Sequence, residues 1–206
     1  MAVFIPLYFA PIVQYVVICQ SKELIFECQD NFQKQTYRNR CYVYGANGRL
    51  SLNVPLKHKA VAEGRKKTKD VLIENNFNWQ KQHFKSLQTA YKSSPFFEFF
   101  EDDLAKIFYK KYTFLHELNL DTHLFVADAL QISSVYSLTN KYKNSATKDY
   151  RSLARAKGGL EFSTPSYVQI FDNKYGFIPN LSILDLLFME GARALIFLKN
   201  ISLSKI

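Results

Sequence analysis

Two arginines and a lysine stand close together at the start of a predicted β-hairpin, and they are the residues of this sequence best suited to hold an anion. In the stretch YRNRCYVYGANGRLSLNVPL, residues 37–56, Arg38 and Arg40 flank Asn39, and Lys34 lies four residues before Arg38. Alternation along a strand places Arg38 and Arg40 on one face. Two guanidinium groups beside an amide can hold a phosphate or carboxylate in bidentate fashion.

The same residues also allow a structural interpretation. Arg38 and Arg40 can instead pair with nearby acids such as Glu27 or Asp30 and tie the entrance of the strand together. The sequence leaves both interpretations of the cluster open.

A second candidate lies before the last predicted helix. Ser182 and Asp185 have the spacing of a capping box, in which the serine caps the helix and the acid reaches back to the serine backbone. This structural interpretation is the stronger one. Free N–H groups at a helix N-terminus also attract anions, and Pro179 and Asn180 lead directly into this end.

The sequence contains no pattern typical of a metal site, a nucleotide-binding loop or a catalytic nucleophile, and no metal site is predicted. His116 and His123 are seven residues apart on one predicted helix, about 10.5 Å along the axis, too far to share an ion bound at about 2 Å. His58 lies in a basic loop and His83 on an apolar helix face. The glycine patterns of nucleotide-binding loops and the G-x-S-x-G nucleophile pattern do not occur.

The charge balance favours acidic partners without choosing among them. The formal net charge is +9, and much of the surplus lies in residues 58–70 and 140–159, which are polar and resemble loops. Nucleic acid is an unlikely partner, because no binding motif and no single basic helix accompanies the charge. Solvated loops are the plainer interpretation of both stretches.

The N-terminal region and the cysteines indicate a cytoplasmic protein. The first twenty residues are apolar, but they contain no Lys or Arg before Lys22, and two prolines interrupt them, so neither a signal peptide nor a membrane span is predicted. Three cysteines, an odd number without a C-x-x-C pair, indicate reduced thiols.

The predicted elements favour an α/β fold. A strand near residues 2–9, a helix over 11–21 and a strand over 22–28 indicate a parallel pair with a right-handed crossover. A hairpin follows, in which Asn47 and Gly48 suit a type I′ turn with positive φ at both residues. A strand is expected over 69–75.

The second half of the chain is predicted to be largely helical. Three helices occupy residues 78–131 as a helical layer or subdomain, short strands lie at 133–140 and 166–173, and a buried helix over 178–200 bends at Gly191. We expect one domain over 1–206 with a mixed central sheet and a hairpin insertion. An α+β arrangement is the alternative, because only one parallel crossover is well signalled.

Three stretches of this sequence resemble the WbqC-like protein family. They are FQKQTYRNRCYVYGANG with LNVPL, NWQKQHFKSLQTAYKSSPFFE, and GFIPNLSILDLLFMEG. The family pattern K-x-x-[WY]-x-N-R, a strand ending in V-P, and a closing Ser-Ile-x-Asp-Leu-Leu-Phe run before a glycine correspond here to Lys34, Tyr37, Asn39, Arg40, Pro55, Ser182, Ile183, Asp185, Leu186, Leu187, Phe188 and Gly191.

One departure from the family pattern concerns the first strand. Many members carry a His-Gln-Pro motif followed by Tyr-x-Pro-Trp, and this sequence keeps Pro11 and Tyr15 but has Ile5 at the histidine position and no tryptophan. If that histidine is catalytic in the family, this chain has a variant chemistry or a binding or scaffolding role.

The resemblance implies a role in surface polysaccharide or O-antigen biosynthesis. The leading hypothesis is a transferase that binds a phosphorylated or acidic sugar-type substrate such as a nucleotide sugar. The alternatives are a non-catalytic partner of glycan-synthesis enzymes and a nucleic-acid-binding protein. The residues assigned to the substrate are Lys34, Arg38, Asn39, Arg40, Asn180 and Ser182, and those assigned to catalysis are Tyr37 and Asp185. No cofactor and no oligomeric state follows from these residues.

Overall fold

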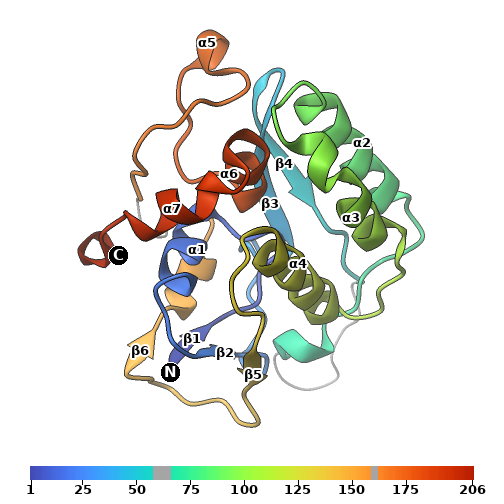
Figure 1. Ribbon diagram of the computed structural model, residues 1–206. Helices are drawn as coiled ribbons and strands as arrows, with labels where there is room; N and C mark the ends of the chain where they lie inside the picture. Colours follow the sequence, from blue (N-terminus) through green and yellow to red (C-terminus); the bar gives the residue numbers. More distant parts are fainter. Residues whose placement is uncertain (58–65, 159–161) are drawn as a thin grey trace.

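The predicted α/β class is confirmed by a computed structural model that describes residues 1–57, 66–158 and 162–206. A small parallel sheet lies at one end of the molecule beneath α1 (Ile12–Ile18) and α4 (Leu115–Ala129), and a separate two-stranded hairpin stands beside α2 (Trp79–Tyr91) (Figure 1). The helical layer contacts both, α2 lying against the hairpin and α4 against the parallel sheet.

The sheet contains four short strands in the order β5-β2-β1-β6, and all of its pairings are parallel. Its strands are β1 (Ala2–Phe4), β2 (Leu24–Phe26), β5 (Tyr136–Leu138) and β6 (Lys148–Asp149). Helix α1 (Ile12–Ile18) joins β1 to β2, so the predicted strand, helix and strand are confirmed. β1 stops before Pro6, because proline has no N–H for the ladder. Strand β6 was not predicted.

The hairpin is confirmed, but its predicted turn is wrong. Strands β3 (Arg40–Gly45) and β4 (Gly48–Asn53) pair with Gly45 opposite Gly48, which makes Ala46 and Asn47 the central turn residues. Gly48 has φ 90°, whereas Asn47 does not have a positive φ. This arrangement is typical of a turn closed by a glycine with positive φ, and it shifts the turn one residue from the predicted type I′ pair.

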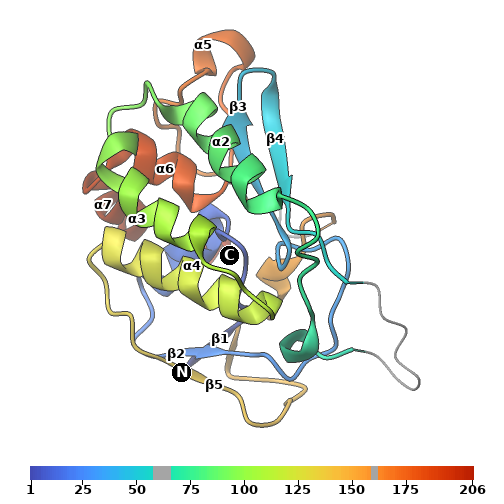
Figure 2. The same cartoon turned by 90° about the vertical axis from the view of Figure 1, so that its right-hand side faces the viewer.

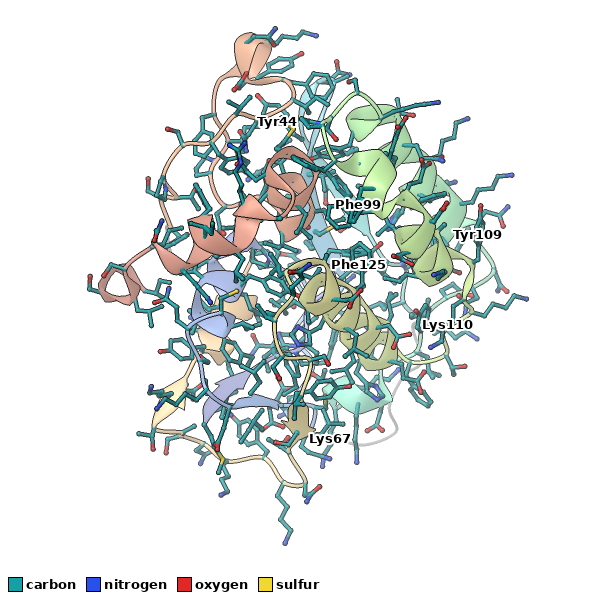
Figure 3. All side chains as sticks on the ribbon, viewed as in Figure 1. Tyr44, Lys67, Phe99, Tyr109, Lys110 and Phe125 are labelled. Carbon is teal, nitrogen blue, oxygen red and sulfur yellow. The ribbon has the colours of Figure 1, made fainter. Side chains whose placement is uncertain are left out.

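Helices α2 (Trp79–Tyr91), α3 (Phe97–Tyr109) and α4 (Leu115–Ala129) form the predicted helical layer (Figure 2). Apolar side chains repeat at helical spacing, and α3 packs against both of its neighbours. Figure 3 shows the side chains that fill the interior around Phe125, whereas Phe99 and Tyr109 on α3 point outward.

The last predicted helix is two helices. α6 (Ile183–Glu190) ends at Gly191, and α7 (Arg193–Lys199) follows in a new direction. Gly191 has φ 52°, and a Cβ there would lie 2.7 Å from the ring of Phe96. Glycine is therefore required at the bend both by conformation and by space.

Two predicted strands are absent from the described residues. The segment 69–75 begins in a 3₁₀ turn and then makes single bridges to two different segments, Leu56 with Ile73 and Leu72 with Phe114, so no ladder forms. In 166–173 the alternation of buried and exposed residues is real, but no strand partner is present, and α5 (Asp172–Tyr175) follows.

The two basic stretches were predicted to be loops, and no membrane span was predicted. Of the predicted loop at residues 58–70, residues 58–65 lie outside the described residues, and Thr68–Asp70 form a 3₁₀ turn. In 140–159 the chain forms β6 and a 3₁₀ turn at Arg151–Ala154 as well as loop. Over residues 1–57, 66–158 and 162–206, none of the helices combines the length and the apolar character that a membrane crossing requires.

Candidate functional site

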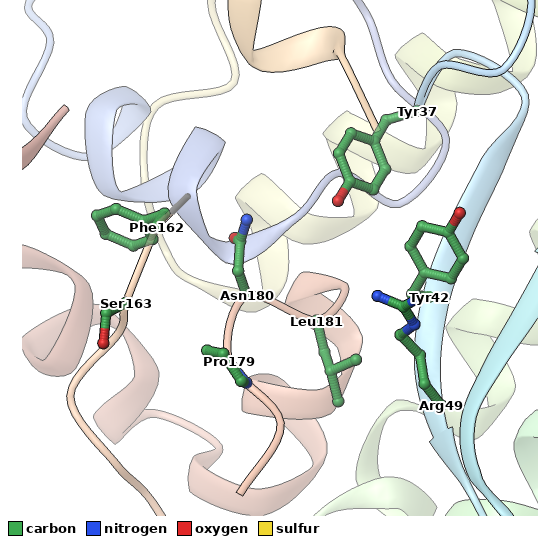
Figure 4. A pocket seen from close by; sticks show the side chains of 8 residues that line it. All are labelled: Tyr37, Tyr42, Arg49, Phe162, Ser163, Pro179, Asn180 and Leu181. Carbon is green, nitrogen blue, oxygen red and sulfur yellow. The ribbon is translucent and has the colours of Figure 1, made fainter. Parts of the chain in front are cut away.

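A pocket of about 460 Å³ lies between the hairpin and the segment that precedes α6 (Figure 4). Its lining residues are Tyr37, Tyr42, Arg49, Phe162, Ser163, Pro179, Asn180 and Leu181. The pocket therefore brings together the two parts of the sequence from which an anion site was predicted. Of the residues predicted to form that site, Tyr37 and Asn180 line it.

The hairpin presents an arginine and a tyrosine to the pocket from one face. Tyr42 lies opposite Ser51 and Tyr44 opposite Arg49, so Tyr42 and Arg49 are diagonal neighbours on the same face. The Arg49 guanidinium carbon lies 4.7 Å from the centre of the Tyr42 ring, and this cation–π contact holds the cation at the pocket wall.

Tyr37 is held by its backbone and directs its ring into the pocket. Its N–H donates to the Ala154 carbonyl at 2.9 Å, and its carbonyl accepts from the Tyr8 N–H at 3.1 Å. The ring meets Tyr42 edge to face at 5.8 Å between centroids. Burial raises the pKa of Tyr37, Tyr42 adds to the rise, and Arg49 opposes it. The phenol therefore keeps its proton at neutral pH and can donate it in a hydrogen bond.

Asn180 joins the pocket to the N-terminal region. It has φ 52°, a conformation that asparagine tolerates better than most residues, and its Oδ1 accepts from the Val13 N–H at 3.0 Å. The neighbouring backbone is tied on both sides, because the Ile12 N–H donates to the Leu181 carbonyl at 3.0 Å and the Ser182 N–H donates to the Tyr42 carbonyl at 2.7 Å. The side-chain amide N–H groups of Asn180 face no protein acceptor within the described residues.

Ser182 caps α6, as its place in the sequence predicted. Its Oγ accepts from the Leu184 N–H at 3.3 Å and donates to the Phe9 carbonyl at 2.8 Å. The hydroxyl is buried, with 2% of the residue exposed. In the structure, Ser182 connects the start of α6 to the chain that follows β1.

Asp185 is a buried hydrogen-bond centre and does not complete the predicted capping box. Its Oδ1 accepts from the Tyr91 hydroxyl at 2.6 Å, and its Oδ2 accepts from the Tyr167 hydroxyl at 2.6 Å and from the Gln169 side-chain amide at 3.0 Å. Burial raises the pKa of Asp185, and these three hydrogen bonds oppose the rise. The carboxylate thus joins α2 and the segment 167–169 to α6.

Arg38 and Arg40 do not share a strand face, so this expectation is corrected. Strand β3 begins only at Arg40, and Arg38 lies in the turn before it, where strand alternation does not apply. The Arg38 side chain is 3% exposed and forms an ion pair with Asp30, while its Nη1 donates to the Thr36 hydroxyl at 3.3 Å. A buried arginine paired in this way joins two parts of the fold.

The remaining motif residues lie outside the pocket lining. Lys34 is exposed in a turn. Asn39 donates from its side chain to the Val54 carbonyl at 3.1 Å and accepts from the Val54 N–H through its own carbonyl at 2.8 Å. Arg40 is partly buried where β3 begins. Ile5, at the position of the family histidine, is 1% exposed in the core.

The electrostatic character of the pocket depends on Arg49. It is the cation of the lining, and the described lining includes no carboxylate. Across the described residues, no group of three His, Cys, Asp or Glu side chains is arranged to hold a metal ion. The arrangement can therefore bind a small anion or an acidic group through a guanidinium, a phenol and an amide.

Arg49 and Tyr42 were missed by sequence reasoning, although the hairpin pattern places them on one face. Arg49 lies opposite Tyr44 in the structure and would lie opposite Ala46 in the predicted turn, and both pairings put it on the strand face of Tyr42. Local sequence did not indicate which face of the hairpin meets the segment before α6. Phe162, Ser163 and Leu181 carried no such local signal.

Comparison with known proteins gives a family for this chain. The WbqC-like protein family is matched over residues 6–159. The chain belongs to the WbqC-like protein family. The match includes Tyr37, Tyr42 and Arg49, whereas the opposite wall, from Phe162 to Leu181, lies beyond it. No curated protein and no solved structure matches the chain.

Proposed function

We propose that the pocket binds an acidic or phosphorylated sugar-type ligand, and that the protein is a transferase of surface polysaccharide biosynthesis. The observation that supports this proposal is the placement of the exposed Arg49 among the aromatic side chains of Tyr37, Tyr42 and Phe162. The volume of about 460 Å³ falls within the range of about 300–1,000 Å³ that is usual for small-molecule sites.

The proposed contacts follow from the donors that the fold leaves free. The Arg49 guanidinium can hold two oxygens of a phosphate or carboxylate at once. Tyr37 adds a phenolic hydroxyl, and Asn180 adds side-chain N–H groups, because its oxygen is already used by Val13. The aromatic rings offer apolar faces to the C–H side of a sugar.

Asp185 then acts as a positioning residue in this proposal. It is 0% exposed and holds Tyr167 and Gln169. The Gln169 side-chain amide donates to the Ile178 carbonyl at 2.9 Å, and the Ile178 N–H returns a bond of 2.8 Å to Gln169 Oε1. This chain of bonds reaches the residue next to Pro179, so the carboxylate fixes one wall of the pocket.

Arg49→Lys tests the proposal, because lysine keeps the charge and loses the planar fork. We expect the affinity for a panel of sugar phosphates and nucleotide sugars, measured by calorimetry, to fall about tenfold, the equivalent of one charged hydrogen bond. Arg193→Lys, an exposed arginine on α7, is the matched control and should bind as the unaltered protein does. Equal effects of the two substitutions, or equal binding of charged and neutral sugars, would refute the proposal.

Detection of the reaction product distinguishes a transferase from a protein that only binds the nucleotide sugar. A transferase should release free nucleotide from a nucleotide sugar when an acceptor sugar is present, and a coupled nucleotide assay measures that release. Tight binding without release would leave the binding half of the proposal standing and would refute the transferase half.

A further inference from the structure

The parallel sheet has one face that no described helix covers. Phe26 of β2 packs on His123 of α4 with 4.9 Å between ring centroids, which places α4 on one side of the sheet. Val3, Ile25 and Ser137 are paired neighbours on β1, β2 and β5, and alternation turns them to the opposite side. Parallel sheets are usually covered by helices on both faces, so this open face is unusual.

A loop, rather than a helix, connects β5 to β6 and borders the open face (Figure 1). Between this loop and the sheet lies a groove of about 960 Å³, separate from the pocket beside the hairpin and sharing no lining residue with it. Val3 and Ile25 supply the aliphatic part of this face, and Leu138, which pairs with Phe26 and therefore lies on the α4 side of the sheet, borders the groove at the end of β5. Lys141, Lys143, Lys148 and Arg151 supply its cations.

Arg151 holds the loop in place. Its Nη1 donates to the Lys143 carbonyl at 2.8 Å and its Nη2 to the Asn144 carbonyl at 3.1 Å, while Nε donates to Asp149 Oδ1 at 2.8 Å. The guanidinium carbon also lies 5.1 Å from the centre of the Tyr142 ring. The backbone of this wall is therefore ordered by the fold before any ligand binds.

The lysines of the groove are not neutralised by carboxylates among the described residues. Among the described residues, Lys141, Lys143 and Lys148 take part in no ion pair. The carboxylate of the lining, Glu27, is 1% exposed, and its Oε1 already accepts from the Gln29 N–H at 2.6 Å and the Thr139 hydroxyl at 2.7 Å. The three ammonium groups thus give the groove a net attraction for an anion.

We propose that this groove binds an anionic amphiphile, an aliphatic chain that carries one phosphate or carboxylate head group. The aliphatic side chains of Val3 and Ile25 suit the chain, and the lysines suit the head. A nucleotide fits less well, because the described lining includes no aromatic side chain on which a base could stack.

Calorimetric titration with octyl phosphate below its micelle concentration tests the proposal. Replacing the lysines together, Lys141→Ala/Lys143→Ala/Lys148→Ala, should lower the affinity about tenfold, because each exposed charge contact is weak and the effect comes from removing all three at once. Inorganic phosphate, which has only the head, and octyl glucoside, which has only the chain, should each bind at least about tenfold more weakly than octyl phosphate.

Matched variants separate the groove from the overall charge and from the other pocket. The control removes three exposed lysines from α2 and its C-cap, Lys81→Ala/Lys85→Ala/Lys92→Ala, and should leave octyl phosphate binding unchanged. Arg49→Lys should also leave it unchanged, so failure of the sugar-type ligand and failure of the amphiphile are independent results.

The apolar half of the groove has its own variant. Ile25→Thr keeps the β-branched shape that suits a strand, and it should lower octyl phosphate affinity about fivefold through lost apolar burial. Circular dichroism checks that each variant folds, and hydrogen exchange of the unaltered protein should show protection over residues 137–148 on adding octyl phosphate.

Three results would overturn the proposal. They are equal binding of inorganic and octyl phosphate, equal losses in the groove and α2 lysine variants, and protection at residues other than the groove. Binding to vesicles that contain phosphatidic acid without binding of monomeric octyl phosphate would also overturn it, in favour of a membrane surface.

Discussion

Replacing the buried carboxylate of Asp185 by an amide is the sharpest test of how the pocket wall is held. In Asp185→Asn the side chain keeps its shape and loses one acceptor oxygen. Tyr91 accepts from the Tyr44 N–H and Tyr167 accepts from the Gln169 amide, and each hydroxyl donates its own hydrogen to a different oxygen of Asp185. An asparagine can satisfy only one side of this arrangement.

The magnitude follows from the bonds that are lost. If the amide oxygen keeps the Tyr91 bond, its NH₂ group faces the Tyr167 hydroxyl and the Gln169 amide, and two bonds to a charged acceptor disappear. At about 1.5–3 kcal/mol each, less the relief of no longer burying a charge, we expect unfolding to be about 3 kcal/mol easier. For a chain of this size this corresponds to a Tm lower by roughly 6–12 °C.

Urea unfolding followed by circular dichroism measures the change. Asp102→Asn is the matched control, because Asp102 is an exposed acid on α3 and its replacement should change the free energy of unfolding by less than about 0.5 kcal/mol. The Asp185 variant should also weaken ligand binding in the pocket beside the hairpin, since the chain of bonds through Gln169 to Ile178 is loosened.

A small effect would contradict this picture of the site. If Asp185→Asn changes the free energy of unfolding by less than about 1 kcal/mol, the native carboxyl is protonated and the two tyrosine hydroxyls do not both donate to it. An unchanged ligand affinity in a strongly destabilised variant would show that the carboxylate supports the fold and not the pocket wall.

Three further predictions concern the rest of the fold. Arg38→Met should lower the free energy of unfolding by about 3–5 kcal/mol because it leaves Asp30 buried without its partner, and Arg38→Met/Asp30→Leu should recover most of that loss in urea titrations. Burial lowers the pKa of His83 and of His123 to about 4, so as the pH falls the unfolded chain binds protons before the folded chain does. The free energy of unfolding should therefore fall between pH about 6.5 and pH 4, by up to about 2.7 kcal/mol per pH unit. Replacing either histidine with Gln should halve this dependence on pH. Gly48→Val should lower the Tm by several degrees, because a β-branched residue resists φ 90°, and an unchanged Tm would contradict that conformation in solution.

The elements of this fold that depend on neighbouring residues alone were predicted from the sequence. The apolar periodicity of 78–131 predicted three helices, and α2, α3 and α4 are present there. The first strand, helix and strand were predicted with their parallel pairing, because a short helix between two apolar strands leaves few other connections. The bend at Gly191 was predicted for the same reason, since it depends on the conformation of one residue.

The tertiary structure decided where the charges went. Arg38, Arg40 and Arg49 are similar in type and close in sequence, yet Arg38 is buried against Asp30 while Arg49 reaches the pocket. The difference depends on where β3 begins, because Arg38 precedes the strand and is buried against Asp30, whereas Arg49 lies within the hairpin on the face of Tyr42. The charges alone do not indicate where the strand begins.

Asp185 and Asn180 show the same limit at longer range. Their partners Tyr91 and Val13 lie 94 and 167 residues away in the chain. The sequence by itself determined that Ser182 caps α6 and that an acid follows three residues later, because both depend on spacing within one helical turn. Only packing decided that the acid turns inward to two tyrosines, because a buried carboxylate takes the donors that the surrounding fold brings to it.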